Sequence, residues 1–207
     1  MPLESPIHPG RVVWTGENPG ILLKEDPDGP LSAVALFFRI AWSPAGRGTV
    51  LMLYENPGSA TSLPDAANVL LSDNRELAEF LRLNFIAKLA AFADAPAFSA
   101  LTHVAITEAW PEGDSNACYR EQVRADGLEI TLTWDDLGAP VALELPAELT
   151  GGKEHEAYNV LVECRRPEIR LNGRILPGKP GPRVQAGIET TSAFLYFSES
   201  WIDPATA

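Results

Sequence analysis

The sequence predicts a mainly β protein, in which one long helix packs against or inside a large antiparallel sheet. Residues that favour turns recur about every ten positions over most of the chain, which is typical of antiparallel sheets, sandwiches and barrels. Between these turns, apolar and polar residues alternate as they do in half-buried strands. Only one stretch, residues 73–93, has the periodicity of a long helix. This helix makes an α+β fold the alternative class.

We expect about twelve strands, more than a strongly twisted open sheet usually holds, so the sheet should curl, close into a barrel or form a sandwich. Residues 31–42 are apolar almost throughout, which indicates a central strand buried on both faces. Residues 128–134 alternate, and Ile130, Leu132 and Trp134 are among those that face inward. The other strands are expected at residues 11–14, 20–24, 49–54, 102–110, 117–124, 141–145, 158–165, on either side of Asn172-Gly173, and at 184–201.

The predicted helix at residues 73–93 has a start signal and a stop signal. Asp73 can cap its first turn, and Glu76 can complete a capping box. Pro96 ends the pattern, because proline has no amide hydrogen and clashes with the preceding turn. The second half of the helix is apolar almost all round, which favours burial on more than one side. A short helix, with a loop as the alternative, is expected at residues 64–71.

Two polar residues interrupt the apolar half of this helix. Asn84 and Lys88 continue the stripe begun by Leu77 and Leu81, so they point roughly toward the core. A lysine aimed at a core is costly unless it is paired, lines a wet cavity or reaches past the helix end. The sequence leaves two interpretations. Either Lys88 extends to solvent near the end of the helix, or Asn84 and Lys88 face a ligand cavity.

Length and charge narrow the class of protein and its partners. The chain has 207 residues without a repeat or a dividing linker, which predicts a single domain over residues 1–207 with flexible tails at 1–9 and 203–207. The formal net charge of −12 argues against a nucleic acid or an anionic membrane as partner, because both bind basic patches.

The chain shows no targeting pattern. No run approaches the roughly 20 apolar residues of a membrane span. The N-terminal residues lack a basic segment followed by an apolar run, which would mark an export signal. A cytoplasmic location is therefore expected, in which Cys118 and Cys164 stay reduced.

Familiar catalytic and nucleotide-binding motifs are absent. The chain contains no G-x-S-x-G, GxxxxGK[ST] or HExxH, and no GxGxxG after a strand. The three histidines, His8, His103 and His155, are not placed as a convergent set of metal ligands, so we expect no metal and no cofactor. His103 shares a predicted strand face with small residues that leave room for a ligand or for the helix. The alternative is a core or edge histidine bonded to a backbone carbonyl.

Candidate site residues lie mostly on strands. A glutamate enclosed together with Lys88 would shift the pKa of both groups and could carry protons. Aromatic residues on strands could line a pocket, although they belong to the core more often. The mid-strand carboxylates are Glu108, Glu121, Glu163 and Glu199, and the aromatic candidates are Trp110, Trp134, Tyr158, Tyr196 and Trp201.

These features favour a protein that encloses an apolar cavity and binds a small hydrophobic ligand. The residues expected to contact this ligand are Asn84, Lys88, His103, Trp110, Trp134, Tyr158 and Tyr196. The second hypothesis is a lyase- or isomerase-type enzyme in the same cavity, with Lys88 as an electrostatic or Schiff-base group and His103 or a glutamate as the proton carrier. The third is a homo-oligomeric interaction protein, such as a homodimer held by apolar helix surface around Phe85 and Leu89.

Overall fold

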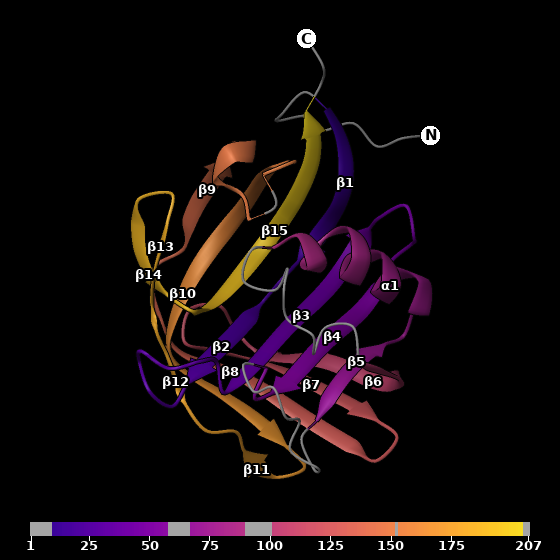
Figure 1. The fold of residues 1–207 in the computed structure, drawn as a ribbon, viewed down its shortest axis with the longest axis vertical. Helices are drawn as coiled ribbons and strands as arrows, with labels where there is room; N and C mark the ends of the chain where they lie inside the picture. Colours follow the sequence, from indigo (N-terminus) through magenta and orange to yellow (C-terminus); the bar gives the residue numbers. More distant parts are fainter. Residues whose placement is uncertain (1–9, 58–66, 90–100, 152, 205–207) are drawn as a thin grey trace.

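The mainly β prediction is confirmed by the computed structural model, which describes residues 10–57, 67–89, 101–151 and 153–204. These residues contain fifteen strands, one α-helix and short 3-10 turns (Figure 1). The strands are β1 Gly10–Glu17, β2 Gly20–Lys24, β3 Ala33–Trp42, β4 Gly48–Glu55, β5 Asn68–Ser72, β6 Thr102–Gly113, β7 Cys118–Ala125, β8 Leu128–Leu137, β9 Val141–Leu145, β10 Glu156–Leu171, β11 Arg174–Ile175, β12 Lys179–Pro180, β13 Pro182–Gln185, β14 Ile188–Thr191 and β15 Ala193–Pro204; the helical segments are α1 Arg75–Asn84, η1 Ile86–Lys88 and η3 Ala147–Leu149.

Thirteen strands form one large mixed sheet that closes on itself. Its pairings run from β1 through β3, β4, β5, β6, β7, β8 and β10 to β15, and β15 pairs with β1 again. The ring is not an even barrel. Among the described strand pairs, β5 with β6 is the parallel one, and the others are antiparallel. Strands β13 and β14 form a separate hairpin.

Two long strands, β10 and β6, link the two layers of the ring. One layer contains β3, β4 and β5, and the other contains β7 and β8. The first half of β10 pairs with β9 and β15, and its second half, from Cys164 onward, pairs with β8. In the same way, β6 pairs with β5 at its start and with β7 from Ile106 onward. The strands β3, β4 and β5 therefore face β7 and β8 across a closed interior (Figure 1).

Alternation along β3 and β4 produces two hydrophobic clusters, one on each face of these strands. Phe37 and Leu51 belong to the inner cluster, which also contains Ile130, Leu132 and Trp134 of β8. The inward face predicted for residues 128–134 is therefore the one that the structure buries. The outer cluster contains the alternate residues of β3 and β4 and the buried face of the helix.

The helix α1 is shorter than predicted, and a different residue caps it. Asn74, not Asp73, accepts a hydrogen bond from the backbone N–H of Leu77, at 3.1 Å. Asp73 instead accepts from the backbone N–H of Thr49, at 2.8 Å, because it lies at the end of β5 beside β4. The α-helix ends at Asn84, a 3-10 turn follows, and residues 90–93 lie outside the described part of the chain.

The helix covers the outer face of the sheet instead of filling the ring. Leu77, Ala78 and Leu81 are buried in the outer cluster against β3 and β4. Figure 1 shows α1 in front of these strands, with β7 and β8 behind them. The helix is therefore packed against the sheet, one of the two arrangements that the sequence allowed. No helix in the described ranges is long and apolar enough to cross a membrane.

Two expectations about local structure need correction. The short helix expected at residues 64–71 is wrong for its described part, because Asn68–Ser72 form β5. These residues pair with β4 on one side and β6 on the other, so tertiary pairing overrides local helix propensity. The flexible tail expected at residues 203–207 is wrong for its described part, since β15 continues through Asp203 to Pro204.

Candidate functional site

A β-bulge interrupts β15 at Ser198. The pairing with β10 shifts there, because Phe197 lies opposite Val160 whereas Ser200 lies opposite Tyr158. Two residues of β15 therefore face a single residue of β10. Ser198 has a φ of 50°, a left-handed conformation that is uncommon outside glycine. Bulges of this kind re-aim side chains and are frequent beside functional sites.

The bulge determines which residues of β15 share a face. Before it, the even-numbered Phe194 and Tyr196 point to the outer cluster, and after it the odd-numbered Trp201 does so. Glu199 lies two residues before Trp201 and therefore points to the same side. Asn159 of β10 lies directly across from the bulge. It points to the same face as Ala157 and Leu161, which belong to the outer cluster.

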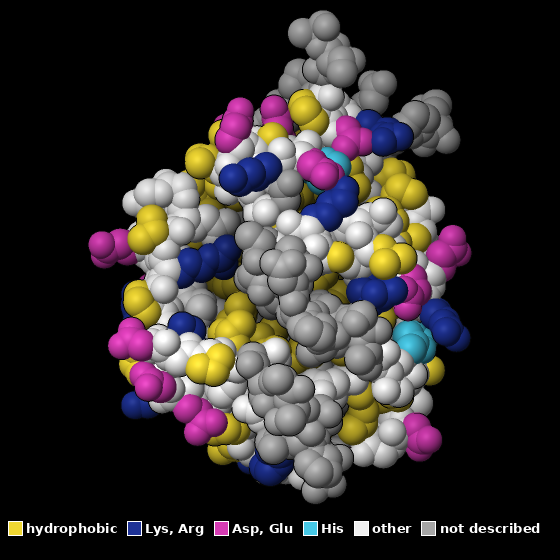
Figure 2. All heavy atoms as spheres, viewed as in Figure 1, with side chains coloured by type: hydrophobic (Ala, Val, Ile, Leu, Met, Phe, Trp, Pro, Cys, Tyr) yellow, Lys and Arg dark blue, Asp and Glu magenta, His cyan; other side chains and the backbone are white. Residues whose placement is uncertain are grey.

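These side chains line an apolar pocket with a volume of about 460 Å³, which we call the Glu199 pocket. It lies where β15, β10 and β2 meet η1, η3 and the β13–β14 hairpin. Hydrophobic side chains gather in a hollow on this side of the molecule, left of centre in Figure 2. Its walls include Leu22, Leu36, Phe85, Leu145, Phe194 and Trp201, and its polar groups include Asn18, Asn159, Arg183, Gln185, Tyr196 and Glu199.

Three buried polar side chains line this pocket, on β15 and on the two segments that flank it, and we call them its polar end. Glu199 and Asn159 are each 1% exposed, and Asn18 is 7% exposed. Trp201 donates from Nε1 to Oε1 of Glu199 at 2.9 Å. Within the described part of the chain, the other carboxyl oxygen of Glu199, both amide atoms of Asn159 and the amide oxygen of Asn18 have no hydrogen-bond partner. Such atoms are rare in folded proteins, because each loses its hydrogen bonds to water.

Burial raises the pKa of Glu199 to about 8, since loss of solvent penalises the charged carboxylate. The hydrogen bond from Trp201, the nearby side chain of Asn18 and the charge of Arg183 act in the opposite direction, but they do not outweigh burial. The carboxyl group therefore changes charge near neutral pH inside an apolar pocket. Groups with this property cluster at binding and catalytic sites.

The β13–β14 hairpin forms one wall of the Glu199 pocket. The guanidinium carbon of Arg183 lies 5.0 Å from the ring centroid of Phe194, in a cation–π arrangement. Tyr196 donates a hydrogen bond from its hydroxyl group to the side-chain oxygen of Gln185. Two side-chain contacts therefore hold the hairpin against β15. Val184, at the hairpin's outer side, is an exposed apolar residue on the pocket's rim.

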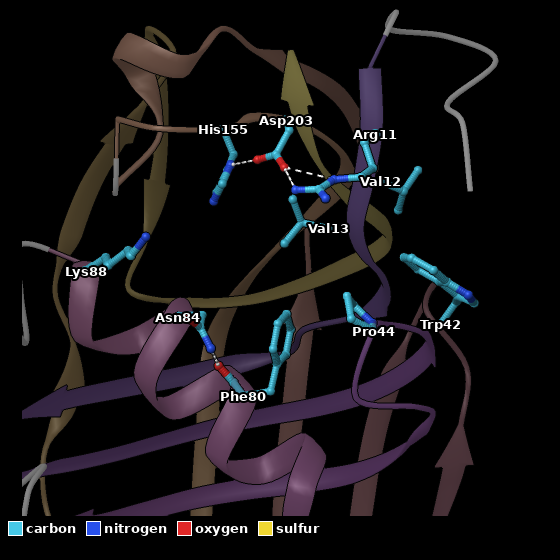
Figure 3. Close-up of a pocket in the computed structure, with 10 residues that line it drawn as sticks. All are labelled: Arg11, Val12, Val13, Trp42, Pro44, Phe80, Asn84, Lys88, His155 and Asp203. Atoms are coloured by element: carbon cyan, nitrogen blue, oxygen red, sulfur yellow. Dashed lines mark hydrogen bonds and ion pairs between the residues drawn. The ribbon is translucent and has the colours of Figure 1, made fainter. Parts of the chain in front are cut away.

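A second pocket lies on the other side of the helix end, and we call it the helix-end pocket (Figure 3). Its volume is about 530 Å³, and Asn84 and Lys88 both line it. Across the pocket, Nδ1 of His155 lies 2.8 Å from Oδ1 of Asp203, and Oδ2 of Asp203 accepts a hydrogen bond from Arg11. The segment from α1 to η1 thus separates the two pockets, since Phe85 faces the Glu199 pocket.

The structure separates the residues that the sequence proposed as one site. Lys88 is 40% exposed and pairs with Glu154, so it reaches the surface while lining the helix-end pocket. Asn84 donates to the backbone oxygen of Phe80 at 3.1 Å. Tyr196 lines the Glu199 pocket instead. The cavity that Asn84 and Lys88 face is therefore not the one that contains the buried carboxyl group.

The remaining candidates lie elsewhere in the sheet. His103 is 2.8 Å from the Ser72 hydroxyl oxygen, and burial together with nearby Arg75 lowers its pKa. Neither His103 nor Trp110, Trp134 or Tyr158 is among the described residues that line the two pockets. Trp110 lies under Arg124, Trp134 is buried in the inner cluster and donates to the oxygen of Gly20, and Tyr158 is half-buried on β10.

The other candidate carboxylates have charged partners. Glu121 is buried, but it accepts hydrogen bonds from Arg39 at 2.6 Å and from Tyr119 at 2.7 Å. Glu108 pairs with Arg124 and Glu163 with Arg165 at the surface. Among the described residues, no group of three or more His, Cys, Asp or Glu side chains is placed to hold a metal ion.

Sequence reasoning missed two residues of the polar end, Asn18 and Asn159. Asn18 follows a strand in a segment that reads as a turn, and Asn159 is one polar residue among the alternating positions of β10. Nothing in their local sequence distinguishes them from exposed asparagines.

Comparison with known proteins finds no family model, no curated protein and no solved structure that matches this chain.

Proposed function

We propose that the protein binds a small, mainly apolar molecule in the Glu199 pocket. One observation carries this proposal: an apolar cavity ends in buried polar atoms that have no partner in the described protein. Leaving such an atom unpaired costs roughly 1–3 kcal/mol of stability. A bound ligand with a polar group would supply the missing hydrogen bonds, and its apolar part would contact the walls.

The size and chemistry of the pocket support the same proposal. Ligand pockets of roughly 300–1,000 Å³ are usual, and they combine apolar walls with a few polar groups that orient the ligand. The Glu199 pocket falls within this range at about 460 Å³. Phe85, Phe194 and Trp201 supply aromatic walls, which favours flat or branched apolar groups.

The first test is native mass spectrometry of the purified protein, compared with its denatured mass. A non-covalently bound small molecule would support the proposal and provide a mass for identification. The same spectrum reports the oligomeric state. A protein without any bound molecule moves the test to added probes.

The second test uses the neutral fluorophore N-phenyl-1-naphthylamine, whose emission increases in apolar surroundings. We expect it to bind wild type and to lose its emission in Leu22→Trp, which fills the pocket from a half-buried position on β2. The matched control is Leu83→Trp, which adds the same side chain at an exposed helix position outside the pocket. No emission gain with wild type, or equal emission from a folded Leu22→Trp protein, would contradict the proposal.

A second candidate function is acid–base catalysis in the same pocket. The pKa of about 8 for Glu199 favours it, because a general acid or base works best near the ambient pH. Lys88 and His103 have separate partners, Glu154 and Ser72, so Glu199 is the glutamate that this enzyme hypothesis would use. Under this hypothesis Glu199→Gln should stop deuterium exchange from D₂O into the bound molecule, whatever its effect on affinity. Exchange that persists in this variant would exclude the role.

A further inference from the structure

When Glu199 is ionised, the polar end of the Glu199 pocket offers more hydrogen-bond acceptors than donors. Among the described residues, the unpartnered acceptors are Oδ1 of Asn18, Oδ1 of Asn159 and Oε2 of Glu199. The one unpartnered donor among these three side chains is Nδ2 of Asn159. An asparagine presents one oxygen whichever way its amide is turned, so the excess of acceptors does not depend on that choice.

The three side chains come from three neighbouring strands or their ends. Glu199 lies opposite Gly16 of β1, and Asn159 lies across from the bulge on β10. The backbone N–H of Asn18 donates to the oxygen of Tyr196 at 2.9 Å, which holds Asn18 beside β15. Side chains on one face of adjacent strands are about 5 Å apart at Cβ. Asn159 and Asn18 therefore flank β15 on its two sides, with Glu199 on the strand between them.

We propose that the group bound at this end of the pocket is a primary ammonium, carried on the apolar body of the ligand. This inference rests on the proposed function. An ammonium group has three N–H donors, which match the three acceptor oxygens of Asn18, Asn159 and Glu199. The carboxylate supplies the opposite charge, and hydrogen bonds between charged groups are the strong ones in a desolvated site.

The surrounding charges fit a cationic ligand, with one exception. The chain's net charge of −12 attracts cations over long range. Among the described titratable groups, those that interact with Glu199 are Arg183, on the hairpin, and Tyr196, on β15. Arg183 opposes a bound cation and lowers the pKa of Glu199. Replacing it should therefore strengthen the binding of an amine.

Binding of an amine should release a proton from Glu199. The pKa of about 8 leaves this carboxyl group mostly protonated at pH 7, whereas a primary amine resembles lysine, with a pKa of about 10.4. The amine keeps its proton, so the carboxyl group must lose one on binding. The affinity should rise about tenfold per pH unit below pH 8 and level off above it.

The test uses four probes that carry the same phenyl ring but different polar groups. For each probe we measure the concentration that displaces N-phenyl-1-naphthylamine from the protein at pH 8. The probes are 2-phenylethylamine, 2-phenylethanol, phenylacetate and trimethyl(2-phenylethyl)ammonium. We expect the primary amine to displace the fluorophore at concentrations at least about tenfold lower than the others, because one extra charged hydrogen bond has this effect. Glu199→Gln should remove the advantage and Arg183→Gln should enlarge it. Glu163→Gln, a half-buried carboxylate paired with Arg165, is the control.

Other results of this displacement test would overturn the ammonium proposal, and they separate its failure from failure of the proposed function. If the alcohol or the carboxylate binds as well as the amine, the inference fails while the proposed function stands. Equal binding of the quaternary ammonium would also overturn it, because that probe has the charge but no N–H donors. Amine binding that weakens as the pH rises from 6 to 8 contradicts the proton release. If the fluorophore itself does not bind wild type, the inference and the proposed function fail together.

Discussion

Glu199 and Glu121 are both fully buried glutamates, but their partners give them different roles. Arg39 and Tyr119 satisfy Glu121, which therefore holds the fold together. Glu199 has one oxygen bonded to Trp201 and the other unpartnered within the described residues, facing a pocket. Burial raises the pKa of both carboxyl groups. The residue with spare hydrogen-bonding capacity is the one available to a ligand.

The raised pKa of Glu199 predicts a specific pH dependence of stability. The folded state holds this proton more tightly than the unfolded chain, so wild type loses stability as the pH rises from about 4.5 to about 8. Glu199→Gln removes this contribution. The difference in unfolding free energy between variant and wild type should grow by up to about 1.4 kcal/mol per pH unit in that window.

Urea unfolding at pH 4, 6 and 8 measures this difference. The control is Glu163→Gln, which makes the same substitution at a carboxylate that is paired with Arg165 outside the Glu199 pocket. A stability difference between Glu199→Gln and wild type that is constant from pH 4 to 8 would contradict the raised pKa.

At the scale of single elements, the bulge in β15 is the feature that forms the site. In a regular strand, residues 196 and 201 would point to opposite faces. Because Ser198 is an added residue, Tyr196 and Trp201 both point to the outer cluster. It also places Asn159 opposite the bend, beside Glu199. The helix end contributes Phe85, its C-cap residue, whose ring centroid lies 4.5 Å from that of Trp201. A strand irregularity and a helix end therefore form the pocket between them.

Substitutions at Ser198 should show the cost of its backbone conformation. Glycine adopts a positive φ freely, whereas a β-branched residue does so poorly. We expect Ser198→Gly to stabilise the protein by up to about 1 kcal/mol and Ser198→Val to destabilise it by about 1–2 kcal/mol. The order should reverse at Thr102, an exposed strand residue without a positive φ, where valine is favoured over glycine. Thermal unfolding of the four variants tests this, and the same order at both positions would contradict it.

At the scale of the whole molecule, the two layers are joined by strands and by an ion pair between the buried Glu121 and the partly exposed Arg39. Arg39 on β3 donates to Glu121 on β7, although three strands separate β3 from β7 in the sheet order. The pair therefore crosses the interior of the ring. Tyr119 and Glu17 complete the polar group around it.

Arg39→Ala should destabilise the protein by about 3 kcal/mol at neutral pH, because it leaves the buried Glu121 carboxylate without its cation. The loss should be smaller at pH 4, since burial already raises the pKa of Glu121 and its protonated form needs no counter-charge. Arg11→Ala, which removes an exposed pair with Asp203, should cost less than about 1 kcal/mol at either pH. Denaturant unfolding at neutral pH and at pH 4 measures the loss of stability in each variant. Equal losses of stability for the two arginine variants would contradict the role of Arg39 as the counter-charge of Glu121.

Local patterns determined much of the fold and part of the site. Alternation identified β8 and its inward face, and helical periodicity identified α1, because these signals depend on neighbours in the sequence. The sequence also placed Glu199 among four mid-strand carboxylates and Tyr196 among five aromatic candidates. It could not rank them, because strand carboxylates and aromatic residues look alike whether they face water, a core or a pocket.

The tertiary structure alone decided ring closure, the position of the bulge and the grouping of site residues. Closure depends on β10 and β6 each pairing with different strands along their length, which involves contacts far apart in the sequence. The bulge depends on the register of β15 against β10. Asn18, Asn159 and Glu199 lie together for the same reason, since each is ordinary in its own segment. Side-chain identity and period are local properties, whereas register and burial arise only when distant strands pair.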